Sequence, residues 1–170
     1  QALLSVWPKT EGPVPIPGVE FTTNIDAAAW IFGTTAVALE LDEGNKFAKG
    51  HPGSHVIPAV LSLAADIGAR GEDAMLAIIA GYEVSARYGQ ATTLHAGVHP
   101  HGNWGIVGAA AACAKLSGLD PDAIATAMDH ASGMVLATAF TSALDGNLVR
   151  NSWLGAVSST PLTLPTTVSV

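Results

Sequence analysis

The chain has 170 residues, of which 49% are hydrophobic and only 12% are charged, and its formal net charge is −7 at neutral pH. This length suits one domain with a buried core. The negative charge argues against nucleic acid as a partner, because phosphate binding needs a basic face. No run of about 18 strongly apolar residues is present, so the sequence predicts no membrane span.

Cys113 is the one cysteine of the chain, which excludes an intrachain disulfide and fits a reducing, cytoplasmic compartment. It lies in an alanine-rich run, so we expect a buried structural thiol rather than a nucleophile. The first residues have neither the basic region nor the long apolar region of a signal peptide. Because no initiator methionine is present, we expect a processed chain or a piece of a longer one.

Capping signals and apolar spacing predict helices along most of the chain, after a lead-in at 1–20 that is rich in proline and glycine. Asn24 is the expected N-cap of the first helix, and Asp120 followed by Pro121 marks the start of the fifth. Alternating strand patterns are absent, except for a weak signal in the tail. The expected helices cover about 25–41, 55–68, 71–90, 104–117, 121–136 and 137–144.

The fold class that follows is all-α, a helical bundle over 21–155 with an irregular tail at 156–170. The tail has no charge and no helical period, and it contains two prolines. The third helix is expected to bury a stripe with three- and four-residue spacing. This stripe consists of Met75, Ile78, Ile79, Tyr82 and Ala86.

Charged residues and histidines gather in two loops that glycine and proline interrupt, 42–54 and 95–103. In a chain with so few charges, this favours a site over a solvated loop, although polar loops are common. We expect the two loops to converge and to place Asp42, His51 and His99 around one pocket. For Glu43 we prefer a solvated helix end.

Zinc is the rival explanation for the histidines, because His51 and His55, like His95 and His99, are spaced i, i+4. Such a pair needs a helix between its members, and Pro52-Gly53 and Gly97 argue against one. No His-Glu-x-x-His motif is present. The sequence therefore predicts no metal ion. His51 is instead expected at a helix N-terminus, where a bound anion is favoured.

The motifs from residue 39 to residue 121 resemble, in order and approximate spacing, those of the MmgE/PrpD family, and the likeness covers roughly 20–155. The residues that carry it are Leu39-Glu40-Leu41-Asp42-Glu43-Gly44-Asn45, His51-Pro52-Gly53, Pro58-Ala59, Ala80-Gly81-Tyr82-Glu83-Val84, His99-Pro100 with Gly102 and Gly105, Gly108-Ala109-Ala110-Ala111, Lys115-Leu116 and Gly118-Leu119-Asp120-Pro121. The family includes 2-methylcitrate dehydratase, cis-aconitate decarboxylase and iminodisuccinate epimerase.

The resemblance implies an α-helical domain followed in the family by a smaller lid domain, a homodimer, and lyase or isomerase chemistry without a metal or organic cofactor. Compared with the family, we expect this chain to lack the lid and the usual N-terminal helices. We therefore expect part of such an enzyme, with at most trace activity when isolated. The family's acidic motif falls on Glu40 and Asp42, its two His-Pro motifs on His51 and His99, and its basic residue on Arg150.

Together these observations predict a cofactor-independent lyase that acts on a small di- or tricarboxylate by acid–base catalysis. Asp42, His99 and His51 are the expected catalytic residues, with Asp42 and His99 as the acid–base pair. His51 and Arg150 are expected to hold substrate carboxylates, and the remaining substrate-binding residues are Glu40 and His101. Dehydration, decarboxylation and epimerisation all stay open. The alternative is a non-catalytic helical fragment that keeps an anion pocket or a dimerisation surface.

Overall fold

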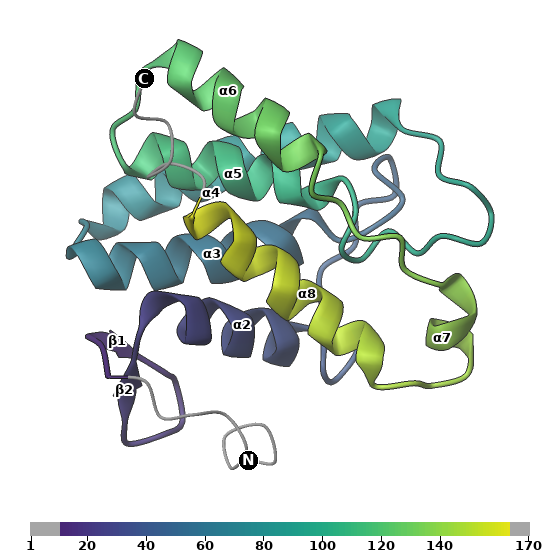
Figure 1. The fold of residues 1–170 in the computed structure, drawn as a ribbon, viewed down its shortest axis with the longest axis horizontal. Helices are drawn as coiled ribbons and strands as arrows, with labels where there is room; N and C mark the ends of the chain where they lie inside the picture. Colours follow the sequence, from purple (N-terminus) through teal and green to yellow (C-terminus); the bar gives the residue numbers. More distant parts are fainter. Residues whose placement is uncertain (1–10, 164–170) are drawn as a thin grey trace.

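The computed structural model describes residues 11–163 and confirms an all-α fold, in which the only sheet in that range has two short strands (Figure 1). The strands β1 (Val14–Pro15) and β2 (Thr22–Thr23) are antiparallel. The helices are α2 (Ile25–Ala36), α3 (Pro52–Ile67), α4 (Gly71–Ala91), α5 (Gly105–Leu116), α6 (Pro121–Ser132), α7 (Phe140–Leu144) and α8 (Val149–Ser159), and a 3-10 turn η1 (Thr160–Leu162) follows.

The acidic loop connects α2 to α3 and carries Glu40, Asp42 and Glu43. The helices on either side of it differ from the expected bounds. Helix α2 ends at Ala36, five residues early, and Glu40 has a φ of 56°, a left-handed conformation that cannot continue a right-handed helix. Helix α3 begins at Pro52 rather than at residue 55, because proline at the first helical position has a favourable φ and lacks only an N–H that would be unpaired. The acidic loop is therefore longer than expected at its start and shorter at its end.

The expectation of an irregular tail from residue 156 was wrong for its first part. Helix α8 runs to Ser159, and η1 follows it to Leu162. Helix α8 carries few large apolar residues, so its period is weak, but it packs against α2 and buries Leu154 and Val157. Residues 164–170 of the tail and 1–10 of the lead-in lie outside the described residues.

Helix α4 buries its small residues rather than the expected stripe of large ones. Its buried positions are Ala74, Ala77, Gly81, Ser85 and Gly89. A Cβ on Gly81 would lie 2.6 Å from the Gly108 carbonyl oxygen of α5, so only glycine permits this approach. The large side chains of α4 that we expected inside, Met75 and Ile79 among them, face outward instead.

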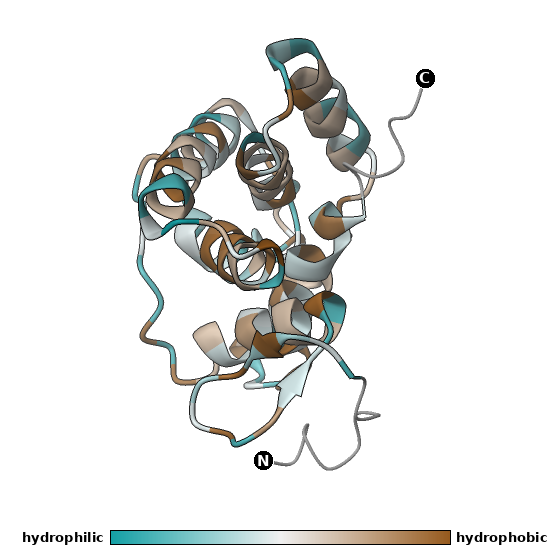
Figure 2. Cartoon of the chain, turned by 90° about the vertical axis from the view of Figure 1, so that its left-hand side faces the viewer, coloured by the Kyte–Doolittle hydropathy of each residue, from teal (hydrophilic) through white to brown (hydrophobic). Residues whose placement is uncertain are grey.

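Helix α5 forms the centre of the bundle, and all its residues from Gly105 to Ala114 are buried. Helices α3, α4 and α6 pack around it, while α2 and α8 form a second pair against α3. Figure 2 shows hydrophobic residues, in brown, on each of the helices that are seen end-on. Cys113 is fully buried in this core, as predicted. None of the described helices combines the length and apolar character needed to cross a membrane.

Long connecting loops gather at one end of the bundle, on the right of Figure 1. The loop before α5 is fixed there by backbone hydrogen bonds to the segment before α7. His99 N donates to the Thr138 carbonyl oxygen at 2.9 Å, and Leu136 N donates to that of Gly102 at 2.8 Å. These two bonds hold the loop that carries His99 and His101 against residues 136–138.

Candidate active site

The acidic loop brings a carboxylate to the start of α3. Asp42 Oδ2 lies 3.1 Å from Nδ1 of His51, which is the N-cap residue of α3. The same Nδ1 also contacts the Glu43 carbonyl oxygen. A ring nitrogen that faces two oxygen acceptors carries the proton, so Nε2 of a neutral His51 has a free lone pair.

Glu43 is part of this structure and is not the solvated helix end that we expected. Its Oε1 accepts a hydrogen bond of 2.8 Å from Gly53 N, one of the unpaired donors in the first turn of α3. Burial raises the pKa of Glu43 above 4.5, although the Gly53 hydrogen bond and the neighbouring His51 oppose this rise. Glu43 therefore fixes the acidic loop to α3.

The second loop holds His99 and His101 against each other. The Thr138 hydroxyl lies 2.9 Å from the His99 carbonyl oxygen and 3.0 Å from that of His101, and it donates to them. Within the loop, His101 N donates to His99 Nδ1 at 3.0 Å. Because Nδ1 of His99 accepts, its ring proton is on Nε2 in the neutral form.

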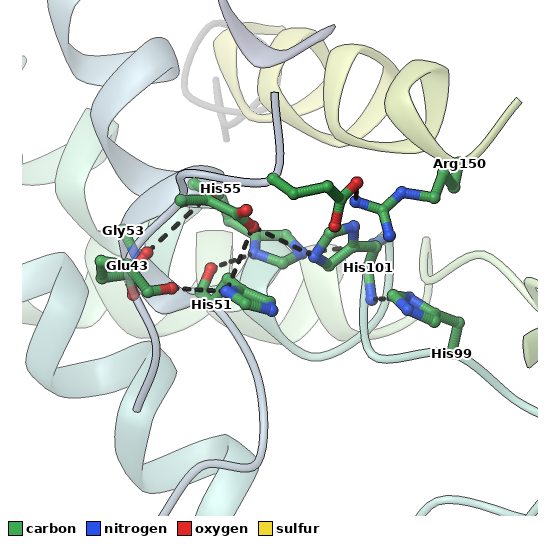
Figure 3. Close-up of polar contacts among 11 residues, drawn as sticks. Glu43, His51, Gly53, His55, His99, His101 and Arg150 are labelled. Carbon is green, nitrogen blue, oxygen red and sulfur yellow. Dashed lines mark hydrogen bonds and ion pairs between the residues drawn. The ribbon is translucent and has the colours of Figure 1, made fainter. Parts of the chain in front are cut away.

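His101 lies between the two clusters (Figure 3). Its ring centroid is 4.9 Å from that of His51 and 4.5 Å from that of His99, and its Nε2 is 3.6 Å from Asp42 Oδ2. The side chain is only 1% exposed, yet neither ring nitrogen has a hydrogen-bond partner among the described residues. Buried polar atoms are rarely left unpaired, so this ring marks the centre of a functional cluster.

The electrostatics keep the inner histidines neutral. Burial and, to a smaller extent, the positive charge of Arg150 lower the pKa of His99 to about 4. Burial also lowers the pKa of His101 to about 2, with the neighbouring histidines acting in the same direction. At neutral pH these two rings can donate and accept hydrogen bonds but carry no charge.

Arg150, in the first turn of α8, brings a cation to the edge of this cluster. Its guanidinium pairs with the Glu40 carboxylate of the acidic loop. A cavity of about 250 Å³ opens beside the pair, and its lining includes Asn147 and Asn151. Cation and cavity together could accept a carboxylate of a small molecule.

The structure confirms that the two histidine-bearing loops converge. It brings together Asp42, His51 and His101, with His99 against His101. That Asp42, His51 and His99 surround one pocket stays a prediction. One cavity lies beside Arg150, and a separate groove borders His51. His95 is exposed.

A metal ion is the other chemistry that these residues could support. Asp42, His51 and His101 offer ligand atoms that all lie within 4.8 Å of one another. The argument that Pro52-Gly53 prevents a helix between His51 and His55 was wrong, since α3 begins there. However, Nδ1 of His51 already faces the Glu43 carbonyl oxygen, which leaves it unsuited to a metal. That no metal binds stays a prediction, which metal analysis of the purified protein tests.

Two residues near the site were missed or given no role in the sequence analysis. Thr138 fixes the second loop, but no signal marked it, because it lies in an apolar segment that was expected to be helical. His55 was considered only as half of a metal pair, and it is fully buried between the two loops. The predicted acid–base pair of Asp42 and His99 makes no direct contact that the structure records, because Asp42 faces His51 and His101 instead.

Comparison with known proteins agrees with this arrangement. Residues 2–148 match the sequence model of the MmgE/PrpD N-terminal domain. The cis-aconitate decarboxylase-like protein oryM of Aspergillus oryzae is 32% identical over 143 residues, which are 75% of this chain and 30% of that protein. The chain thus spans less than a third of the length of this curated relative. The matched residues include both loops of the candidate site.

Proposed function

The chain belongs to the MmgE/PrpD family, and we propose that it forms the helical part of a cofactor-independent lyase acting on a small di- or tricarboxylate. The observation that carries this proposal is the contact of one buried carboxylate, Asp42, with two histidines from different loops, His51 and His101. Proton transfer next to a substrate carboxylate needs such positioned groups.

His51 is the proposed acid–base residue. Asp42 and the Glu43 carbonyl oxygen fix its Nδ1 side, so Nε2 is available to remove a proton from a carbon beside a carboxylate. This assignment gives Asp42 the role of orienting His51 rather than of exchanging protons with His99. The contacts of Asp42 support the change, and a carboxylate that fixes a histidine tautomer is a recurring catalytic arrangement.

His99 is the proposed hydrogen-bond donor to negative charge that develops on the substrate. Its Nδ1 accepts from His101 N, so its Nε2 carries the proton, and its low pKa of about 4 keeps it neutral. A preorganised donor in a buried site stabilises a developing anion without having to reorient. His101 is more deeply buried, and its ring would hold the rings of His51 and His99 in place by packing against both.

Arg150 is the proposed anchor for a substrate carboxylate, since its planar fork can form two parallel hydrogen bonds with one. Glu40 occupies that position in this structure and is 64% exposed, so an incoming carboxylate could replace it. The cavity of about 250 Å³ next to the pair supports this placement. Glu40 would then border the bound substrate.

Decarboxylation and dehydration differ in whether a carbon of the substrate gains or loses a proton. In a decarboxylation the C–C bond breaks, carbon dioxide leaves, and the electron pair left on carbon takes a proton. His51 could deliver that proton from Nε2 only as imidazolium, after taking a proton from solvent, with Asp42 beside it to balance the charge. In a dehydration the base removes a proton from carbon while the departing hydroxide takes one. The likeness to a cis-aconitate decarboxylase-like protein makes decarboxylation the first reaction to test. A homodimer and a cytoplasmic setting stay predictions.

The test is an assay of the whole gene product with cis-aconitate and 2-methylcitrate, following products by NMR. His51→Gln removes the proposed acid–base group and should abolish turnover, whereas His130→Gln, on the exposed end of α6, should leave it unchanged. Full activity of His51→Gln would rule out the assigned mechanism. A wild-type protein that turns over neither acid, yet binds them, would favour the non-catalytic alternative.

A further inference from the structure

His55 connects the two loops of the site. It lies in the first turn of α3, and its ring reaches across to the loop that carries His101. Nδ1 of His55 lies 2.9 Å from the His51 carbonyl oxygen, and Gly102 N donates to Nε2 at 3.2 Å. One ring therefore contacts the backbone at His51 and the backbone directly after His101.

The partners of the ring determine its protonation state. A carbonyl oxygen can only accept, so Nδ1 of His55 must carry the proton, and an N–H group can only donate, so Nε2 must be unprotonated. The ring is thus the neutral Nδ1–H tautomer. Burial lowers its pKa to about 4, which agrees with this assignment at neutral pH.

Packing holds the ring in this orientation. His55 is 0% exposed, and a Cβ on Gly105 would lie 2.3 Å from its Cγ, so the ring rests directly on the backbone at the start of α5. Trp104 covers it at a centroid distance of 5.9 Å. Because the ring cannot move, the two backbone segments that it contacts are held at a fixed distance from each other.

We propose that His55 is a positioning residue that sets the distance between the loop of His51 and the loop of His101 and His99. Its two hydrogen bonds reach the backbone at His51 and at Gly102, and Gly102 is 47 residues after His55. Among the described residues, no other side chain hydrogen-bonds to the backbone of both loops. His55 does not itself face either cavity beside the site. The catalytic consequence rests on the proposed function, whereas the structural link does not.

Two conservative variants separate the two hydrogen bonds. The amide nitrogen of His55→Asn can take the place of Nδ1, which keeps the bond to His51 and loses the bond to Gly102. The amide oxygen of His55→Gln can take the place of Nε2, which keeps the acceptor for Gly102. The bond to Gly102 is the one that crosses between the loops, because His51 lies only four residues before His55 at the start of the same helix. If His55 acts by positioning, His55→Gln should therefore retain kcat within about tenfold, while His55→Asn should lose about 100-fold, the effect of misplacing a catalytic group.

The matched control is Ser62→Ala, which removes another buried hydrogen bond of α3, the one that Ser62 donates to the Pro58 carbonyl oxygen, far from both loops. This variant should lose stability but keep kcat and KM. If His55→Asn and His55→Gln lose activity equally while their stabilities match that of Ser62→Ala, His55 has only a structural role and the proposal fails.

A measurement without substrate separates this proposal from the proposed function. In hydrogen exchange followed by NMR, the Gly102 amide should exchange about fivefold or more faster in His55→Asn than in the wild type and His55→Gln. The ring ¹⁵N pattern of wild-type His55 should be that of the Nδ1–H tautomer. An Nε2–H pattern, or unchanged Gly102 exchange in His55→Asn, would overturn the link even if turnover is found. Absence of turnover in the wild type would overturn only the proposed function.

Discussion

Arg150 reaches from the first turn of α8 to Glu40, 110 residues earlier in the chain, and pairs with its carboxylate. The Arg150 side chain is 13% exposed and that of Glu40 is 64% exposed, so the cation is fixed in the protein while the anion can leave. Glu40 also adopts a φ of 56°. Non-glycine residues in that region cost free energy and often occur at functional sites.

Replacing Arg150 should weaken substrate binding. Arg150→Lys keeps the charge but loses the planar fork, so we expect KM to rise about tenfold, with a larger rise in Arg150→Ala. Steady-state kinetics with cis-aconitate measures both. The control is Arg87→Lys, whose guanidinium pairs with Glu83 on the exposed face of α4. An unchanged KM in Arg150→Ala would remove the residue from the site.

Replacing Asp42 by asparagine should lower kcat by about 100-fold or more, with little change in KM. The carboxylate lies 3.1 Å from His51 Nδ1 and its charge favours the proton there, whereas the amide is neutral and can turn its NH2 group to the ring and stabilise the wrong tautomer. Asp129→Asn, on the exposed surface of α6, is the matched control. If Asp42→Asn raised KM and left kcat intact, Asp42 would belong with the substrate-binding groups.

Acid should destabilise the fold before its carboxylates titrate. The pKa of His55 is about 4 in the folded chain against an ordinary 6.5, so the unfolded state binds the proton first as pH falls. Stability is then present above pH 6.5 and is lost as pH falls towards 4, by about 2 kcal/mol at pH 5 for this residue. Burial of His99 acts in the same direction.

Urea unfolding at pH 7 and pH 5 measures this effect. The wild type should lose more free energy of unfolding between the two pH values than His55→Gln does. His130→Gln should behave like the wild type, because His130 is exposed at the end of α6. Equal losses in the wild type and His55→Gln would show that His55 does not contribute to the acid sensitivity.

Cys113 should be inert in the folded protein. It is fully buried in the core, and burial raises the pKa of its thiol to about 12, so almost no thiolate exists at neutral pH. A thiol reagent should label it only after urea unfolding. Rapid labelling of the native chain would indicate that α5 opens locally.

Features that neighbouring residues decide could be predicted from the sequence, whereas features that depend on packing between distant segments could not. The structure confirms the predicted N-caps Asn24 and Asp120, because capping depends only on residues a few positions apart. Helix α8 was missed because its burial comes from α2, which is distant in sequence. Convergence of the two loops was predicted from their composition. The pairing of Asp42 with His51 rather than His99 was not, since it depends on how Thr138 and His55 hold the second loop.

The outward face of α4 should mediate self-association. Met75, Leu76 and Ile79 are 56%, 56% and 58% exposed there, while the helix turns its small residues to α5. Large apolar side chains grouped on one exposed face are typical of an interface or of an aggregation-prone surface. Size-exclusion chromatography with light scattering should find the chain larger than a monomer. Ile79→Glu should shift it towards the monomer, whereas Ala125→Glu, an exposed position on α6, should not. A monomeric wild-type chain would show that this face has no role in association.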